Sequence, residues 1–378
     1  MDYKRDLPKQ LEKTIAAMAN TLGGLVLIGV EEDELGKPKV PMVGLGLERG
    51  LSERVTNIVL SNVTPPVFPE IAVCPNDGND RVVLVVRVPQ SHLSPHAIQQ
   101  NTSVYIRTGN RNSPERLASL DDLAWLQDRR QRSVRLREHL FDAAVKRSDL
   151  VFGFLAADRV SSFRPVETQP TNLILRAVPE FPSPELVSPP ELQRLYQQLR
   201  VRDYYGTDYN FPLGNANATI LQNGICTSVV LDSDKGKRHY YAEFSVFGQF
   251  FYRQTLTANF DGRVIIRASE IFARVDQFLD TSRNFFDKLG YRGAVRMLCS
   301  VYGAHTSALG QWGPSEMGLP ISTCPDITIG HETTFLAADW AIASRQALIQ
   351  GIRTVGWAYD WDIPEALLDS YYAKHKRT

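Results

Sequence analysis

The segment TIAAMANTLGGLVLIGVEED, residues 14–33, constrains the fold more than any other part of the chain. Apolar side chains recur at helical spacing before it and within it, which predicts a helix over residues 8–22. Gly23 and Gly24 then end that helix, because glycine adopts the positive-φ conformation that is common at a helix C-terminus. The apolar run over residues 25–30 predicts a buried strand, which ends beside several acidic residues.

The order of these elements decides what the glycine pair can bind. A Walker A loop needs GxxxxGK[ST], and the sequence contains no such match. A dinucleotide fingerprint follows a strand and opens a helix, whereas here a helix precedes the glycines and a strand follows them. The C-terminus of a helix also carries the negative end of its dipole, which repels phosphate. The glycine pair is therefore predicted to be a turn, and the acids after it are either solvated or part of a site.

Composition limits the remaining classes. A chain of 378 residues can form two or three domains with buried cores. It has no apolar window of about 18 residues and a charged N-terminus, so we expect neither a membrane span nor a secretory segment. Four scattered cysteines without a CxxC pair indicate reduced thiols in a cytoplasm and no zinc site. Because the net charge is +0, nucleic-acid binding would need a local patch; the run RRQRSVRLR is one candidate, although a solvated connecting helix is favoured.

The hydrophobic pattern of the rest predicts an α/β (α+β) chain. In the first part we expect a helix over 51–60, strands over 81–88 and 103–108, and then an amphipathic helix. In the second part we expect a helix over 269–289, a strand over 294–303 and a helix over 333–352. The predicted organisation is a mixed-sheet domain over residues 1–130, a basic connecting helix over 131–150 and a second α+β domain over 151–378.

Four sequence elements follow one another in the first part of the chain: DYK, IAAMANTLGGLVLIGVEED, VRVPQSHLSP and VYIRTGNRNSP. Together they resemble the Schlafen AlbA_2 domain family over residues 1–130. The resemblance implies a nucleic-acid-binding domain, and in animal Schlafen proteins two such lobes form a horseshoe that cleaves tRNA or other structured RNA. The C-terminal part resembles the extension found on many bacterial members. Because this chain has a single lobe, the resemblance implies a homodimer.

The same resemblance implies a carboxylate site that binds Mg²⁺ or Mn²⁺. Its second acid falls on Asp2, beside Lys4, and its third on Glu32, with Glu31 and Asp33 as neighbours that could substitute. The first acid has no counterpart, because the sequence begins at Met1; either it lies upstream or the protein lacks this ligand. Carboxylate oxygens suit both metals, a bound metal can polarise a phosphate and generate hydroxide, and Lys4 could stabilise the developing charge.

Basic residues around this edge are expected to contact a phosphate backbone, and each could equally be a solvated surface charge: Arg5, Lys9, Lys13, Arg107 and Arg111. Tyr105 is expected to pack against the sheet rather than stack on bases. His92 and His96 are expected to lie in a loop, because a Ser-Pro pair between them disfavours a helix.

The leading hypothesis is a cytoplasmic protein that binds RNA or DNA, needs neither ATP nor a membrane, and forms a dimer. Whether it is an enzyme is left open; a Mg²⁺- or Mn²⁺-dependent endonuclease acting in defence against phage or in regulation would fit the resemblance. The alternative is a non-catalytic nucleic-acid-binding regulator or a subunit of a larger defence complex. A third hypothesis is a structural subunit without affinity for nucleic acid.

Overall fold

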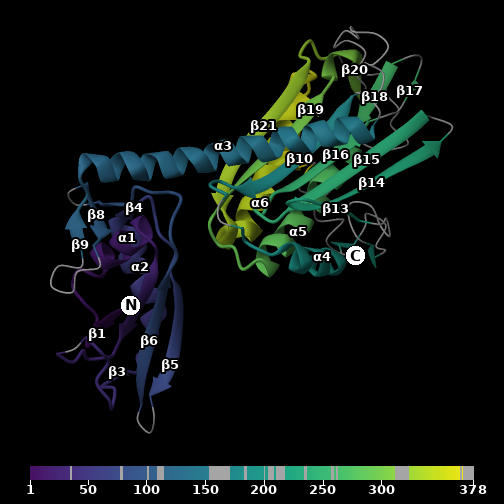
Figure 1. Ribbon diagram of the computed structural model, residues 1–378. Coiled ribbons are helices and arrows are strands. Elements are labelled where there is room, and N and C mark those ends of the chain that lie inside the picture. The colour runs from purple at the N-terminus through teal and green to yellow at the C-terminus, as the bar shows by residue number, and fades with distance from the viewer. Residues whose placement is uncertain are drawn as a thin grey trace. The chain divides into compact units, whose positions relative to one another are not determined.

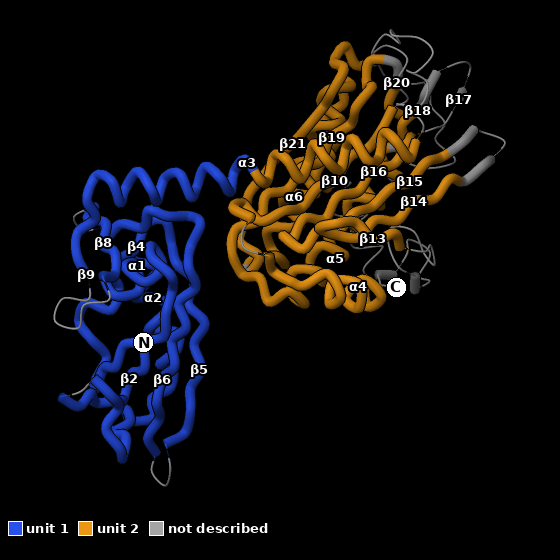
Figure 2. Tube along the Cα trace, viewed as in Figure 1, with its two compact units in different colours: residues 1–135 blue, residues 136–378 orange. Residues whose placement is uncertain are grey.

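A computed structural model divides the chain into two compact units, residues 1–135 and residues 136–378 (Figure 2). It describes residues 1–34, 36–76, 80–99, 102–108, 115–152, 171–182, 185–199, 201–202, 208–209, 218–233, 236–256, 259–260, 263–310, 323–366 and 368. Each unit is α+β and has its own hydrophobic core, so the predicted fold class is confirmed. No helix within the described ranges combines the length and apolar composition that crossing a membrane requires.

Unit 1 contains two small sheets (Figure 1). The first has the order β1-β2-β6-β3, and β5 also pairs with β6; β1 runs parallel to β2, and the other pairs are antiparallel. The second is antiparallel in the order β4-β7-β8-β9. The strands are β1 (Asp2–Lys4), β2 (Gly24–Ile28), β3 (Leu45–Gly46), β4 (Val63–Thr64), β5 (Glu70–Asn76), β6 (Arg81–Val88), β7 (Ala97–Ile98), β8 (Ser103–Arg107) and β9 (Glu115–Leu117).

Helix α1 (Leu11–Asn20) contacts strands of both sheets, and α2 (Leu51–Asn62) packs beside it. This position explains the small-residue sequence of α1, because Ala16, Ala17 and Ala19 are fully buried and let strands approach from two sides. The predicted helix over 8–22 is therefore too long. The chain leaves the helix at Thr21, whose N–H donates to Met18 O at 3.0 Å, and Leu22 is 80% exposed.

Helix α3 (Leu120–Val151) is continuous across the boundary between the units. In unit 2, its second half packs against one face of an antiparallel seven-stranded sheet of order β13-β14-β15-β16-β10-β19-β21 (Figure 1). Phe141 and Ala144 lie in a cluster with Tyr241 and Phe251 of the sheet. The strands are β10 (Asn172–Pro179), β13 (Thr219–Leu221), β14 (Gly224–Ser233), β15 (Gly236–Ser245), β16 (Phe250–Thr255), β19 (Ala294–Tyr302) and β21 (Thr328–Leu336).

The main core of unit 2 lies on the other face of this sheet, against three helices: α4 (Pro189–Gln198), α5 (Ala268–Lys288) and α6 (Trp340–Ala358). Two short 3₁₀ helices span Ala304–Thr306 and Ala337–Asp339. Short strands form two further sheets: β11 (Val201–Arg202) with β12 (Asp208–Tyr209), and β17 (Asn259–Phe260) with β18 (Arg263–Arg267) and β20 (Ser307–Gly310).

One prediction in unit 2 is wrong. Residues 333–336 were expected to begin a helix, but they belong to β21, and the helix begins at Trp340. The strand is fixed by a partner that is distant in sequence, because β21 pairs with β19 from Ala294↔Leu336 to Tyr302↔Thr328. The predicted helix over 269–289 and strand over 294–303 agree with α5 and β19 to within one residue.

Candidate functional site

The site predicted from the sequence centres on β1, the edge strand of the first sheet. Asp2 and Lys4 lie two positions apart on this strand, so their side chains share one face. Lys4 Nζ is 3.2 Å from Asp2 Oδ1. Asp2 is 8% exposed, and pairing of Asp2 with Val26 of β2 fixes its backbone. The carbonyl of Lys4 accepts hydrogen bonds from Gly29 N–H at 2.8 Å and Val30 N–H at 3.1 Å.

Arg107, the last residue of β8, supplies the second cation around Asp2. Its Nη1 is 3.6 Å from Asp2 Oδ2. That distance is an ion pair but too long for a hydrogen bond. Both atoms are buried and have no hydrogen-bond partner among the described groups of the protein. The backbone N–H of Arg107 donates to Thr21 Oγ1 at 2.9 Å, which anchors the end of β8 to the end of α1.

Lys13 and Tyr105 continue the site along α1 and β8. Lys13 Nζ lies 4.7 Å from the centroid of the Tyr105 ring, a cation–π contact. Tyr105 is two residues before Arg107 on the same strand, so the two side chains share a face. Tyr105 also packs against the core of unit 1, as expected for a sheet residue. Next to Lys13, Thr14 Oγ1 donates to Glu115 Oε1 at 2.8 Å.

Arg5 and Lys9 are exposed and form no ion pair with any residue in the described ranges. Arg111 lies outside the described residues. We use the name cationic surface for the group Lys4, Arg5, Lys9, Lys13, Tyr105 and Arg107. Two acids, Asp6 and Glu12, lie in the same segment of sequence as these cations. The positive charge is therefore confined to the cationic side chains and does not extend over the whole segment.

The acids that follow β2 have partners of their own. Glu31 Oε1 is 3.2 Å from Lys39 Nζ, and Glu32 is exposed, with its backbone in an isolated β-bridge to Pro38. Within the described ranges, no three His, Cys, Asp or Glu residues come together in a way that could hold a metal ion. Asp2 is already in contact with two cations, which would repel a divalent cation. As described, this donor set does not fit Mg²⁺ or Mn²⁺, and metal binding by Asp2, Glu31 and Glu32 stays a prediction.

The Asn-Thr pair at the end of α1 has a structural role that sequence reasoning did not identify. Asn20 is fully buried, and its Nδ2 donates to the carbonyls of His96 and Tyr105, both at 2.9 Å. Its Oδ1 accepts from His96 N–H at 2.8 Å. Asn20 thus joins α1 to β8 and to the loop that holds His96. The sequence did hold a signal for this role, because Asn20 is a polar residue at a position that continues the apolar face of the helix.

The histidines lie in this loop, as predicted. His96 is fully buried, and its Nδ1 lies 2.6 Å from Pro65 O. Burial, opposed by that hydrogen bond, lowers the pKa of His96 to about 4. Burial and the nearby charge of Arg129 lower the pKa of His92 to about 4 as well. Both rings are therefore neutral at pH 7, and neither is poised to titrate there.

The arginine-rich run of α3 is largely occupied by intramolecular contacts. Arg129 donates to the carbonyls of Asn20 at 3.0 Å and Thr21 at 3.1 Å, where a cation stabilises the C-terminus of α1. Burial lowers the pKa of Arg129 to about 10, so it remains charged at neutral pH. Arg132 and Arg135 both pair with Asp128, and in unit 2 Arg137 pairs with Glu180. These contacts favour the connecting-helix interpretation over a nucleic-acid patch.

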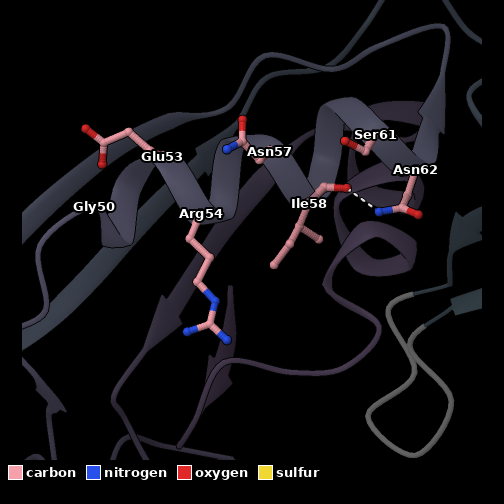
Figure 3. Close-up of a pocket in the computed structure, with 7 residues that line it drawn as sticks. All are labelled: Gly50, Glu53, Arg54, Asn57, Ile58, Ser61 and Asn62. Atoms are coloured by element: carbon pink, nitrogen blue, oxygen red, sulfur yellow. Dashed lines mark hydrogen bonds between the residues drawn. The ribbon is translucent and has the colours of Figure 1, made fainter.

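A shallow hollow of about 490 Å³ runs along the outer side of α2 (Figure 3). It is lined by Gly50, Glu53, Arg54, Asn57, Ile58, Ser61 and Asn62. None of the residues of the cationic surface lines it. Its side chains are mostly exposed, and its one arginine and one glutamate give it no clear preference for an anion or a cation.

Unit 1 is thus an α+β domain in which two sheets enclose a small-residue helix and bring cations from β1, α1 and β8 together. Residues 1–116, within unit 1, match the family described as Schlafen, AlbA_2. The resemblance drawn from the sequence motifs is confirmed for this part of the chain.

Two solved structures are similar over 31% of the chain. The DIP2311 protein from Corynebacterium diphtheriae is 20% identical, with a TM-score of 0.23, and the match spans only 21% of that chain. The N-terminal domain of a RecG-related protein from Nitrosomonas europaea is 22% identical over 76% of its length, with a TM-score of 0.21. At these scores neither structure bears on the activity of this chain. No curated protein matches the sequence.

Proposed function

We propose that unit 1 binds nucleic acid by contacting phosphates with its cationic surface. The observation that carries this proposal is the convergence of Arg107, Lys4 and the Lys13–Tyr105 pair from three different elements of the fold. Arginine and lysine are the side chains that bind phosphate oxygens, arginine through a planar fork and lysine as a point charge. The match to the Schlafen AlbA_2 family over residues 1–116 supports the same class of ligand.

The geometry favours contact with the backbone of the nucleic acid over recognition of its bases. The Tyr105 ring is half-buried and has the Lys13 ammonium group against it, so this ring is not a free platform for base stacking. Phosphate contacts position a protein on nucleic acid but carry no sequence information. We therefore expect similar affinity for different sequences and a strong dependence on salt.

Cleavage is the second candidate function, and the family match favours it. A Mg²⁺- or Mn²⁺-dependent RNA or DNA endonuclease acting in defence or in regulation would need more acidic ligands than the described residues bring together. Binding without cleavage is therefore the expected outcome for this site. A homodimer would present two cationic surfaces. Sedimentation velocity with and without nucleic acid would measure the oligomeric state directly.

The test uses the full chain and fluorescently labelled tRNA, single-stranded DNA and double-stranded DNA. Fluorescence anisotropy gives Kd over a series of salt concentrations, and gel analysis with Mg²⁺, Mn²⁺ or EDTA detects cleavage. The variant Arg5→Gln/Lys9→Gln removes two exposed cations that form no ion pair with a described residue, so the slope of log K against log salt should fall by about two. The control Arg49→Gln/Arg54→Gln makes the same change of charge on two exposed residues, one just before α2 and one in its first turn.

Loss of affinity in the first variant but not in the control supports the proposal. Absence of binding at low salt, or equal losses in both variants, would overturn it. Metal-dependent cleavage that is lost in Asp2→Ala and Glu32→Ala would instead establish the nuclease and its predicted ligands.

A further inference from the structure

The carboxylate of Asp2 occupies the position between two cations that an oxyanion ligand would take. Lys4 Nζ lies 3.2 Å from one of its oxygens, and Arg107 Nη1 lies 3.6 Å from the other. Asp2 is 8% exposed, whereas the side chains of Lys4 and Arg107 are 32% and 19% exposed. The cations therefore reach the surface, while the carboxylate that neutralises them lies beneath it.

The contact of Asp2 with Arg107 is longer than its contact with Lys4. The contact on the Arg107 side joins opposite charges but is too long for a hydrogen bond. Asp2 Oδ2 and Arg107 Nη1 are both buried and without a hydrogen-bond partner among the described protein groups. A buried charged donor without an acceptor is costly, so the Arg107 guanidinium gives up no hydrogen bond to a described protein group at Nη1 when it turns toward an oxygen atom at the surface.

We infer that Asp2 is an internal counter-anion, and that a phosphate oxygen of bound nucleic acid replaces it as the partner of Arg107. This inference rests on the proposed function. Lys4 keeps its contact with Asp2 Oδ1, so only the long contact is exchanged, and Arg107 gains the hydrogen bond that it lacks. Before binding, the carboxylate holds the two cations in place and lowers the positive charge of the site. Asp2 therefore positions Lys4 and Arg107, and it also limits affinity for phosphate.

As a counter-anion, Asp2 should change the affinity for nucleic acid in the opposite direction from a metal ligand. A counter-anion competes with phosphate, so removing its charge should tighten binding, in the presence of EDTA as well as of a metal. A metal ligand brings phosphate to the site through the cation, so its removal should weaken metal-dependent binding. The sign of the change in affinity therefore separates the two roles, and a purely structural role would not tighten binding at all.

The experiment compares Asp2→Asn with Asp6→Asn in the full chain, by anisotropy with labelled single-stranded DNA and tRNA in EDTA. Both variants remove one negative charge from the same segment, but Asp6 is exposed and forms no ion pair with any described residue. Asp2→Asn should lower Kd by about tenfold, the change that ~1.4 kcal/mol produces, whereas Asp6→Asn should change it by about twofold at most.

If Asp2→Asn does not fold, the same comparison can be made with one fewer cation in the cluster. The Kd of Lys4→Gln is then compared with the Kd of Asp2→Asn/Lys4→Gln. The double variant should then bind more tightly than the single one. If the wild type binds and Asp2→Asn leaves that affinity unchanged or weakens it, this inference is overturned but the proposed function is not. Equal tightening by Asp6→Asn also overturns it, because the effect would then be one of overall charge. No binding by any form overturns both.

Discussion

Asn20 offers the sharpest test of how the first unit is held together, through the substitution Asn20→Ala. Its side chain is fully buried and makes three hydrogen bonds to backbone groups of His96 and Tyr105. Each bond contributes about 1 kcal/mol net, and a buried group left without a partner costs about 1–3 kcal/mol. Alanine cannot fill the space and admits little water, so we expect a loss of roughly 3–5 kcal/mol in the free energy of unfolding of unit 1.

A loss of this size is a large part of the stability of a typical domain, which is about 5–15 kcal/mol. Because the chain has two units, its overall unfolding need not be two-state, and a local measurement is required. Hydrogen exchange of the His96 amide provides one, since that N–H donates to Asn20 Oδ1. Urea unfolding monitored by circular dichroism gives the accompanying change in midpoint.

Two further variants show whether hydrogen bonding is the cause. Asn20→Asp keeps the acceptor for His96 N–H but places a carboxylate oxygen against two carbonyls, so it should destabilise at least as much as Asn20→Ala. Asn57→Ala, on the exposed side of α2, should change stability by less than about 0.5 kcal/mol. The reasoning is refuted if Asn20→Ala costs no more than Asn57→Ala, or if exchange at His96 does not accelerate.

Three other predictions concern the same unit. Arg129→Gln should lower stability by about 2–4 kcal/mol, because carbonyls at the end of α1 lose charged donors, whereas Arg132→Gln on the surface should leave the urea midpoint unchanged. Gly23→Ala should cost more than about 1 kcal/mol by the same measurement, since Gly23 has φ +73° and a Cβ there would lie 2.5 Å from Val88 O. Burial lowers the pKa of His96 from 6.5 to about 4, so the contribution of neutral His96 to the free energy of unfolding is fully present above pH 6.5 and falls by ~2 kcal/mol at pH 5. The difference between the urea midpoints at pH 7 and pH 5 should therefore be smaller in His96→Gln than in the wild type.

Local sequence signals predicted the elements that depend on local interactions. The Gly-Gly pair was predicted to end a helix and precede a buried strand, and Gly23 does follow α1 with a positive φ before β2. The strand over 81–88 agrees with β6, because its β-branched residues fit a buried pleated surface. The error at residues 333–336 arose where pairing with β19 outweighed a pattern that also fits a helix.

The site was predicted only in part, because its contacts join residues that are far apart in sequence. The two-residue spacing of Asp2 and Lys4 puts them on one face of any strand, and that contact follows from the sequence alone. The contact between Asp2 and Arg107 depends on how β8 and β1 meet, which no local pattern encodes. The same is true of Lys13 and Tyr105, which belong to a helix and to a strand of the second sheet.

The Asn-Thr pair links these two kinds of information. Asn20 binds the carbonyl of Tyr105, and Thr21 Oγ1 accepts the N–H of Arg107, so the end of α1 fixes two alternate residues of β8. Those residues are the ones whose side chains meet Lys13 and Asp2. A motif that looks like part of a ligand site therefore acts through the backbone, by setting where the cations lie. It follows that Thr21→Val, which removes this acceptor but keeps the shape, should weaken nucleic-acid binding even though Thr21 belongs to no part of the cationic surface; unchanged Kd in a folded Thr21→Val protein would contradict this link.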